Sequence, residues 1–313
     1  MVMDRTVSMT EPVPDSSAKE TFEASVARRP VNALSVDIED YFQVYAFSRV
    51  IDRADWPHYP SRVEANTDRI LALFEEAGAK ATFFTLGMIA ERFPTLIRRI
   101  ADQGHELASH GWEHYHVFEQ DRKAFAADVE RTKKTLEDVG GVAVNGYRAA
   151  SFSINQNTWW AYDALAAAGH RYSSSVNPIK HDHYGVPNAP RFAFRPGDLP
   201  LVEIPVSTRE VAGRRLAAGG GGYFRLLPYA WFRHNIRRLN TQEGASSIFY
   251  FHPWEVDPDQ PRINGAPAKA RFRHYVNLDR MAAKLQRLLH DFAWDRVDHV
   301  FPMQPDGLPV WRP

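Results

Sequence analysis

Three histidines crowd into seven residues of this chain, in the stretch ASHGWEHYH at residues 108–116. Two of them, His110 and His114, are four positions apart, so in a helical turn their rings come within roughly 6 Å of each other and can reach one metal ion. Alone, this spacing is a weak signal, because a chance cluster of histidines on a polar surface also shows it. The pair predicts a metal site only if another part of the chain supplies a further ligand.

Carboxylates are the natural source of that ligand, because the 313 residues include no cysteine and a metal must be held by His, Asp or Glu. The segment SVDIEDYF, which ends an apolar run, contains Asp37, Glu39 and Asp40. On its own, such a cluster is typical of a solvated turn. Beside two imidazoles, one carboxylate completes a site that leaves positions open on a divalent ion for water and substrate.

Two more polar residues each follow an apolar run elsewhere in the chain. Arg148 lies in YRAASFS and His252 lies in FYFHPWE. Singly, the arginine is most simply a surface ion-pair partner and the histidine a buried core residue. Because the four segments end four different predicted strands, together they indicate one site rather than four coincidences.

The elements that must position these segments alternate along the chain. Short apolar runs predict strands, and a helical spacing of apolar residues predicts helices between them. The alternation predicts a mostly parallel sheet, either a distorted barrel or an open doubly wound sheet, with function at the carboxyl ends of the strands. The predicted strands are residues 31–36, 80–86, 105–109, 142–147, 171–176, 201–206 and 247–252, and the predicted helices are residues 61–77, 94–104, 125–139, 158–168, 228–240 and 278–292.

Two local patterns add detail to these elements. Ser61 and Glu64 have the spacing of a capping box, in which the Ser hydroxyl accepts a hydrogen bond from an early backbone N–H of the first helix. Four consecutive glycines at residues 219–222 predict a flexible run, and no phosphate-loop or dinucleotide motif surrounds them.

Composition excludes some classes of protein. Hydrophobic residues make up 44% of the chain, and Lys+Arg and Asp+Glu both number 38, so no excess charge points to nucleic acid. Residues 1–28 predict a disordered tail, and residues 29–313 predict a single barrel domain. With no apolar core of a signal peptide and no run of about 18 apolar residues, we expect a soluble, cytoplasmic protein.

The predicted helix at residues 228–240 carries apolar residues beside arginines. Our preferred interpretation is an outer helix of the barrel with a basic face. The alternative is a helix that rests on a membrane surface, where the protein would meet exopolysaccharide-synthesis machinery.

Taken in order, SVDIEDYF, TFFTLG, HELASHGWEH, YRAASFS and FYFHPWE resemble the motifs of the polysaccharide deacetylase family, carbohydrate esterase family four. The resemblance covers about residues 31–300 and is greatest to the branch found with exosortase-linked exopolysaccharide gene clusters. It implies an α/β fold, a distorted seven-stranded (β/α) barrel. It also implies a hydrolase acting on linear amide C–N bonds, which removes N-acetyl groups from an exopolysaccharide or its precursor glycan with one divalent ion, Zn²⁺.

The resemblance implies a role for each matching residue of the earlier motifs. Asp37 matches the general base and Glu39 the acidic metal ligand. Asp40 is the alternative ligand, because one residue separates two positions that are adjacent in many relatives. His110 and His114 match the metal-binding pair.

The later motifs imply the remaining roles. Arg148 matches the arginine that holds the base, Ser151 the position whose backbone N–H faces the oxyanion, and His252 the general acid. One departure concerns Ser173, which stands where the family usually has Asp. Glu203, inside the sixth predicted strand, is the candidate replacement.

Aromatic residues near the motifs are candidate substrate contacts, together with Glu203. Trp112, inside the metal motif, is a candidate for stacking on a sugar ring. Tyr250 and Trp254 are candidates for a small apolar pocket that takes the acetyl methyl group. Plain core packing is the alternative for each of these aromatic side chains.

Two other functions keep the fold and change the activity. The same barrel could act on a lipid-linked sugar or a non-sugar amide. A catalytically silent glycan-binding protein is the other alternative, which Ser173 favours and the intact motif residues oppose.

Overall fold

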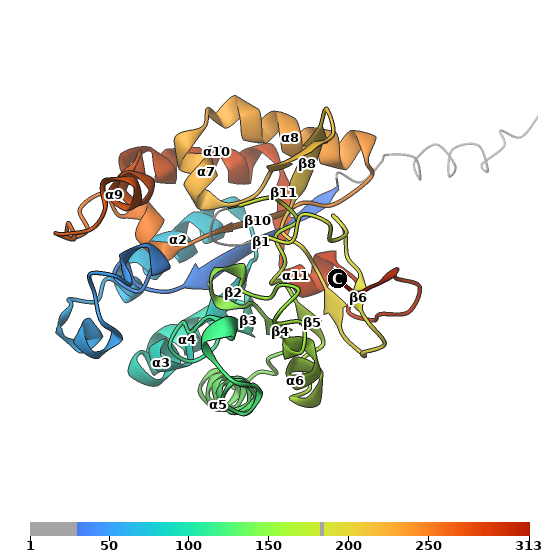
Figure 1. The fold of residues 1–313 in the computed structure, drawn as a ribbon. Coiled ribbons are helices and arrows are strands. Elements are labelled where there is room, and N and C mark those ends of the chain that lie inside the picture. Colours follow the sequence, from blue (N-terminus) through green and yellow to red (C-terminus); the bar gives the residue numbers. More distant parts are fainter. Residues whose placement is uncertain (1–29, 182–184) are drawn as a thin grey trace, which may run out of the picture.

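The structure is a computed structural model that describes residues 30–181 and 185–313, so the predicted tail at residues 1–28 lies outside the described residues. Its main sheet holds eight strands, all paired in parallel, in the order β10-β1-β2-β3-β4-β5-β7, with β11 paired to β1 outside that path. This curled sheet (Figure 1) confirms the predicted distorted barrel. The strands are β1 (Val31–Ile38), β2 (Thr82–Thr85), β3 (Glu106–Ser109), β4 (Gly146–Tyr147), β5 (Tyr172–Ser173), β7 (Val202–Glu203), β10 (Ile248–Phe251) and β11 (Ala293–Asp295).

All seven predicted strands are present, but β4, β5 and β7 have only two residues each. The reason is visible after β5. The backbone N–H groups of Ser175 and Val176 donate to the Glu203 carboxylate, at 2.8 and 2.7 Å, rather than to a neighbouring strand. An apolar run predicts burial, and it does not show where a ladder of backbone hydrogen bonds ends.

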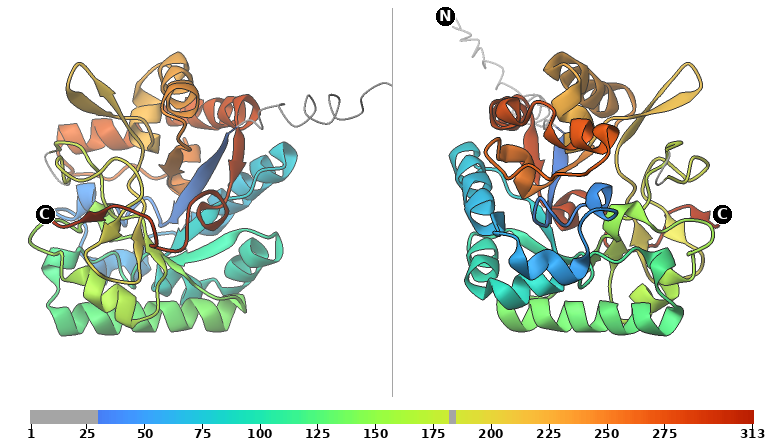
Figure 2. Two further views of the ribbon diagram at one scale, coloured as in Figure 1. Left: turned by 90° about the vertical axis from the view of Figure 1, so that its right-hand side faces the viewer. Right: turned by 60° about the vertical axis from the view of Figure 1, so that its left-hand side comes forward.

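The barrel is distorted where its two edges face each other. Among the residues that the structure describes, no strand pairing joins β7 to β10. Instead Ser207, which follows β7, links the edges, because its Oγ accepts a hydrogen bond from Ile248 N of β10 at 2.8 Å. Two small sheets lie outside the barrel, one of β6 (Arg195–Pro196) with β12 (Val310–Trp311), and the projecting hairpin (Figure 2) of β8 (Thr208–Val211) with β9 (Arg214–Ala217).

Helices surround the sheet on its outer side (Figures 1 and 2). All six predicted helices are present, and the unpredicted α3, α7, α9 and α11 have four to eight residues, too few for a helical period to show. The α-helices are α2 (Val63–Ala77), α3 (Gly87–Arg92), α4 (Pro94–Asp102), α5 (Arg122–Gly140), α6 (Ala161–Ala167), α7 (Gly221–Leu226), α8 (Tyr229–Gln242), α9 (Ala268–Tyr275), α10 (Met281–Asp291) and α11 (Val297–Val300). The 3-10 helices are η1 (Tyr45–Phe47), η2 (Arg53–His58), η3 (Val117–Glu119), η4 (Ala150–Phe152), η5 (Pro253–Val256) and η6 (Leu278–Arg280).

The largest core cluster lies between the sheet and helices α2, α4, α8 and α10. Phe232 and Ile236 of α8 are fully buried in it, beside Phe249 of β10. The apolar face of α8 therefore packs on the barrel, as the preferred interpretation expects, and contact of this helix with a membrane stays an untested prediction. Within residues 30–181 and 185–313, no helix is both long enough and apolar enough to span a bilayer.

Two local predictions, the capping box and the flexible glycine run, are wrong. Helix α2 begins without the capping box, because Ser61 Oγ donates to Asp40 Oδ2 at 2.5 Å instead of accepting from the helix. Three of the four glycines, residues 219–221, are buried, and a Cβ on Gly219 would lie 2.4 Å from the carbonyl oxygen of Ile248. These glycines let the chain cross closely over β10, which is a packing requirement and not a sign of flexibility.

Candidate active site

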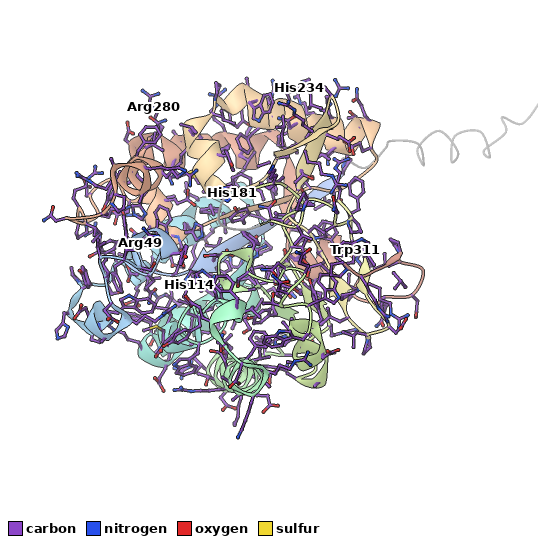
Figure 3. The ribbon with its side chains drawn as sticks, in the orientation of Figure 1. Arg49, His114, His181, His234, Arg280 and Trp311 are labelled. Atoms are coloured by element: carbon purple, nitrogen blue, oxygen red, sulfur yellow. The ribbon has the colours of Figure 1, made fainter. Side chains whose placement is uncertain are left out.

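Glu39, His110 and His114 meet at the carboxyl ends of β1 and β3. Their ligand atoms all lie within 4.8 Å of one another, and all three side chains are buried. Glu39 Oε2 is 3.0 Å from His114 Nε2. In Figure 3 the His114 side chain lies beside the tip of β1, as expected for residues that follow parallel strands. We call these three residues the ligand cluster.

The backbone of residues 110–114 differs from the expected helical turn. This stretch is irregular, and both Gly111 and His114 adopt left-handed backbone conformations, with φ of 75° and 56°. The two rings nevertheless come together, with centroids 5.3 Å apart. A left-handed conformation is costly for a non-glycine residue and concentrates at functional sites, where the surrounding structure holds it.

His110 is oriented and neutral. Its Nδ1 lies 2.8 Å from the carbonyl oxygen of Arg148. Because a carbonyl only accepts, Nδ1 carries the proton and Nε2 keeps a free lone pair. Burial, reinforced by the neighbouring His114, lowers the pKa of His110 to about 4. A neutral imidazole whose other nitrogen is hydrogen-bonded is the usual form of a metal ligand.

Glu39 is the carboxylate of the cluster. Burial raises its pKa, but the neighbouring His114 and His252 outweigh this effect and lower the pKa to about 2. Its Oε2 accepts no hydrogen bond of good geometry within the described chain, although it is buried. An ionised, orphaned carboxylate oxygen that faces imidazole nitrogens is what a cation site requires.

Asp40 points elsewhere. Its carboxylate accepts hydrogen bonds from Ser61 Oγ at 2.5 Å and from Arg62 N at 3.1 and 3.2 Å. The structure thus brings Glu39, and not Asp40, to the histidines.

Asp37 and Arg148 form a buried ion pair beside the cluster. Arg148 Nη1 donates to Asp37 Oδ1 at 2.6 Å and to Ser35 Oγ at 3.0 Å. On its other side, Arg148 Nε and Nη2 donate to the carbonyl and hydroxyl oxygens of Ser174, at 3.1 and 3.0 Å. Because the guanidinium is held at both ends, it fixes one oxygen of Asp37 and leaves Oδ2 facing the site.

His252 faces the same space from the end of β10. Its Nε2 lies 3.5 Å from Glu39 Oε1 and 4.0 Å from Asp37 Oδ2, and its Nδ1 lies 2.8 Å from Glu255 Oε1. Burial lowers its pKa, but the charges of Glu39 and Glu255 outweigh burial and raise the pKa to about 9. With these carboxylates as neighbours, His252 holds a proton at neutral pH.

Ser151 lies in η4, directly after β4 on the same side of the sheet. It has a left-handed backbone with φ of 51°, and the next residue, Phe152, has φ of 53°. A left-handed conformation at two consecutive non-glycine residues is strained, and such strain concentrates at functional sites.

Among the predicted substrate contacts, Trp112 has no free face. A Cβ on Gly87 would lie 2.3 Å from its ring, and the Arg131 guanidinium lies 3.2 Å from its ring centroid. Sugar stacking by Trp112 is therefore wrong, and Trp112 is a packing residue.

Trp254 is likewise enclosed. Its ring stacks between His252 and His274, with centroids 5.2 and 4.1 Å away, and its Nε1 donates to Glu39 Oε1 at 3.3 Å. It orients site residues and does not line a methyl pocket. Tyr250 remains a candidate for the pocket, since it packs edge to face on Phe152 at 4.9 Å beside the buried guanidinium of Arg148.

Glu203 does not take the place of the missing Asp. It is fully buried, burial raises its pKa, and it accepts from Tyr162 Oη and from the backbone N–H groups of Ser175 and Val176. The carboxylate that accepts a hydrogen bond from Nδ1 of the predicted acid is Glu255, which our sequence interpretation missed. The only sequence signal for it is a Glu three residues after His252 in HPWE.

A cavity of about 130 Å³ adjoins the ligand cluster at His114. Aromatic rings and polar groups both face it, a composition that suits a sugar ring. The sequence offered no motif for this segment, because its lining, apart from His114, comes from loops and the short 3-10 helices η1 and η2 that follow β1. Its lining residues include Phe42, Tyr45, Asp52, Arg53 and Trp56.

Two family models match consecutive parts of the chain. The family described as polysaccharide deacetylase matches residues 55–172. A family described only as a domain of unknown function, DUF3473, matches residues 174–302.

Curated relatives match a limited part of the chain. A peptidoglycan-N-acetylglucosamine deacetylase of Bacillus cereus is 31% identical over 91 residues, which are 29% of this chain and 33% of that protein. A peptidoglycan deacetylase of Helicobacter pylori is 27% identical over 118 residues, which are 36% of this chain and 38% of that protein. The chain thus spans little more than a third of the length of these relatives.

One solved structure matches nearly the whole chain. It is a protein from Mycobacterium smegmatis assigned as a polysaccharide deacetylase, with a TM-score of 0.56, 21% identity, and coverage of 95% of this chain and 93% of that chain. At this identity the match shows a shared fold.

Proposed function

We propose that this chain, which belongs to the polysaccharide deacetylase family, removes N-acetyl groups from an exopolysaccharide or its precursor glycan by metal-dependent hydrolysis. One observation carries the proposal. A base held by arginine, a set of metal-type ligands and a protonated histidine converge, with His252 Nε2 within 4.0 Å of both Asp37 Oδ2 and Glu39 Oε1.

The donor set fits a divalent ion. His110 offers a neutral nitrogen, His114 a second nitrogen, and Glu39 an ionised oxygen without a hydrogen-bond donor. Two imidazoles and one carboxylate suit Zn²⁺, which we propose as the ion. When bound, such an ion makes water acidic enough to lose a proton near neutral pH and polarises the acetyl carbonyl.

The proton transfers belong to the chain's own residues. Asp37 Oδ2 takes a proton from the attacking water, while Arg148 holds Oδ1 so that the second oxygen stays directed at the site. The backbone N–H of Ser151 stabilises the oxyanion, a contribution of roughly 3–4 kcal/mol for one such donor. His252 Nε2 then gives a proton to the departing nitrogen, because an amine anion is too basic to leave an amide unaided.

The proposal also names the class of substrate, an exopolysaccharide or its precursor glycan. The cavity beside His114 supplies aromatic faces and charged groups at the position where a neighbouring sugar unit of a polymer would lie. The two curated relatives are named for peptidoglycan, which makes a peptidoglycan glycan the main competitor of an exopolysaccharide in any test.

Acetate release tests the function directly. We would offer the purified chain a panel of N-acetylated glycans, with and without a chelator, and compare wild type with Asp37→Asn. Wild type should release acetate, the chelator should abolish release, and Asp37→Asn should lose about 10²–10⁴-fold in kcat while keeping its metal. Asp138→Asn, at an exposed ion pair with Lys134 on α5, is the matched control and should match wild type. Equal activity of the Asp37→Asn protein would remove the base assignment, and glycan affinity without acetate release would favour a silent binding protein.

A further inference from the structure

Arg225, near the end of α7, is a buried charge outside the ligand cluster. Its side chain is 1% exposed, and its guanidinium donates four hydrogen bonds. Nε donates to Glu255 Oε2 at 2.6 Å, Nη1 donates to the carbonyl oxygens of His274 and Val276 at 2.8 Å each, and Nη2 donates to that of Arg273 at 3.1 Å. A buried arginine is costly unless its N–H groups find acceptors, and these four hydrogen bonds offset that cost.

Glu255 connects that charge to His252. Its side chain is 1% exposed, Oε2 binds Arg225, and Oε1 accepts from both Nδ1 and the backbone N–H of His252, at 2.8 and 3.1 Å. A carboxylate cannot donate, so it selects the form of His252 that carries its proton on Nδ1 and turns Nε2 toward the reacting groups.

The start of α7 packs directly against this carboxylate. A Cβ on Gly221 would lie 2.2 Å from Glu255 Oε1, so a larger residue at the first position of α7 would displace the carboxylate. The plane of the His252 imidazole is oriented by stacking, because the Trp254 ring lies between the rings of His252 and His274. His274 is in turn held by Gln260, whose Oε1 lies 2.6 Å from its Nε2 and whose Nε2 donates to the Trp254 carbonyl.

All of these residues lie between 221 and 276, inside the region matched only as a domain of unknown function. We propose that Glu255 and Arg225 are positioning residues that hold His252 as the proton donor. These three residues form what we call the acid half of the site, and it is supplied by the C-terminal region of the chain. The inference rests on the proposed function, because it concerns how the same hydrolysis ends.

The step concerned is the collapse of the tetrahedral adduct of water and the acetamide. The C–N bond breaks, its electron pair moves to the nitrogen, and the proton on His252 Nε2 passes to that nitrogen. The products are acetic acid, which keeps both oxygens and ionises to acetate at neutral pH, and the free amine of the sugar. Glu255 never reaches the substrate, so its loss should matter only where the leaving group needs that proton.

Two substrates separate this role from a structural one. An N-acetylated chito-oligosaccharide has an amine leaving group that must be protonated, whereas p-nitrophenyl acetate releases a phenolate that needs no acid. For Glu255→Gln we expect kcat on the amide to fall by about 10²–10³-fold, with KM and kcat on the aryl ester within about threefold of wild type. Glu255→Asp should recover part of the amide rate.

Asp257→Asn is the matched control. Asp257 is also a buried carboxylate next to η5, but its partners are Arg62 and Asn66. If losing a buried carboxylate here acts only by loosening the structure, Asp257→Asn should lower the amide and the aryl-ester activities together. If Glu255→Gln also lowers both by the same factor, or leaves the amide rate intact, the positioning role is overturned.

A measurement on the wild-type chain covers the case in which Glu255→Gln does not fold. With ¹⁵N-labelled histidine, the His252 signals, identified by their loss in His252→Asn, should show a proton on Nδ1. A neutral ring protonated only at Nε2 would overturn the inference. This result does not depend on turnover, so a wild-type protein that releases no acetate from any N-acetylated glycan would defeat the proposed function and leave the tautomer result standing.

Discussion

His110 and His252 each follow a strand of one sheet, and their surroundings give them opposite protonation states. The Nδ1 of His110 meets a backbone carbonyl and its pKa is lowered to about 4, chiefly by burial. The Nδ1 of His252 meets the Glu255 carboxylate and, although burial lowers its pKa, nearby carboxylates raise it to about 9. The second partner of an imidazole therefore decides whether the ring offers a lone pair or a proton.

The two kinds of histidine also lie in different parts of the chain. The histidines of the ligand cluster lie in the region matched as polysaccharide deacetylase, and His252, Glu255 and Arg225 lie in the region matched as DUF3473, whereas Glu39 precedes both. Trp254 joins the ligand cluster to the acid half of the site, because it stacks on His252 and donates to Glu39.

The largest effect is expected on the ligand side. His114→Ala removes a nitrogen from the ligand cluster, so bound metal should fall from one ion per chain to none and turnover should fall to background. Metal content by elemental analysis and acetate release measure the two effects. A variant that keeps stoichiometric metal would show that the ion is held elsewhere.

The next effect separates the acid half from the ligand half. His252→Asn should lower kcat on an N-acetylated glycan by about 10²–10⁴-fold and leave the metal content unchanged. Titration with a chromogenic chelator, together with steady-state kinetics, checks both parts. Loss of metal together with activity would mean that His252 is a ligand, and the comparison would fail.

A smaller effect is expected at the link between the halves. Trp254→Phe keeps an aromatic ring between His252 and His274 but removes the N–H that binds Glu39. We expect metal affinity to weaken by roughly 10–100-fold, as for other partners of metal ligands, with kcat at saturating metal close to that of wild type. Competition with a chelator of known affinity measures the change, and an unaltered affinity would show that the 3.3 Å contact does not support the ligand.

The mildest effect concerns the stability of the metal-free chain. For His252 the folded pKa of about 9 exceeds the usual histidine pKa of 6.5, so its stabilising contribution is complete below pH 6.5 and is lost as the pH rises through about 9. For His110 the folded pKa of about 4 lies below 6.5, so its contribution is present above pH 6.5 and is lost as the pH falls through about 4. Urea unfolding of chelator-treated protein across this range should show both losses.

His252→Asn provides the control for that measurement. It should flatten the alkaline loss and leave the acid loss, to which the buried His105 and His170 also contribute because burial lowers their pKa values. An unchanged alkaline loss would mean that His252 does not carry a raised pKa in the metal-free protein.

Much of the fold could be predicted because long amphipathic helices and apolar runs report burial directly. Helices α2 and α8 lie close to their predicted ranges, and β1 to β3 match the apolar runs. The two-residue strands could not be delimited, since Glu203 competes for the backbone N–H groups after β5. The short α7 and α9, which hold Arg225 and His274, have too few residues for any period.

For the candidate site, residue type and position determined the chemistry on offer: imidazoles, carboxylates and an arginine that follow separate parallel strands must gather at one edge of the sheet. Only the tertiary structure decided between Glu39 and Asp40, enclosed Trp112 and Trp254, and brought Arg225 across 30 positions to Glu255. The physical reason is that spacing along a strand limits which side chains can meet, whereas hydrogen bonds and packing between distant segments select which of them do.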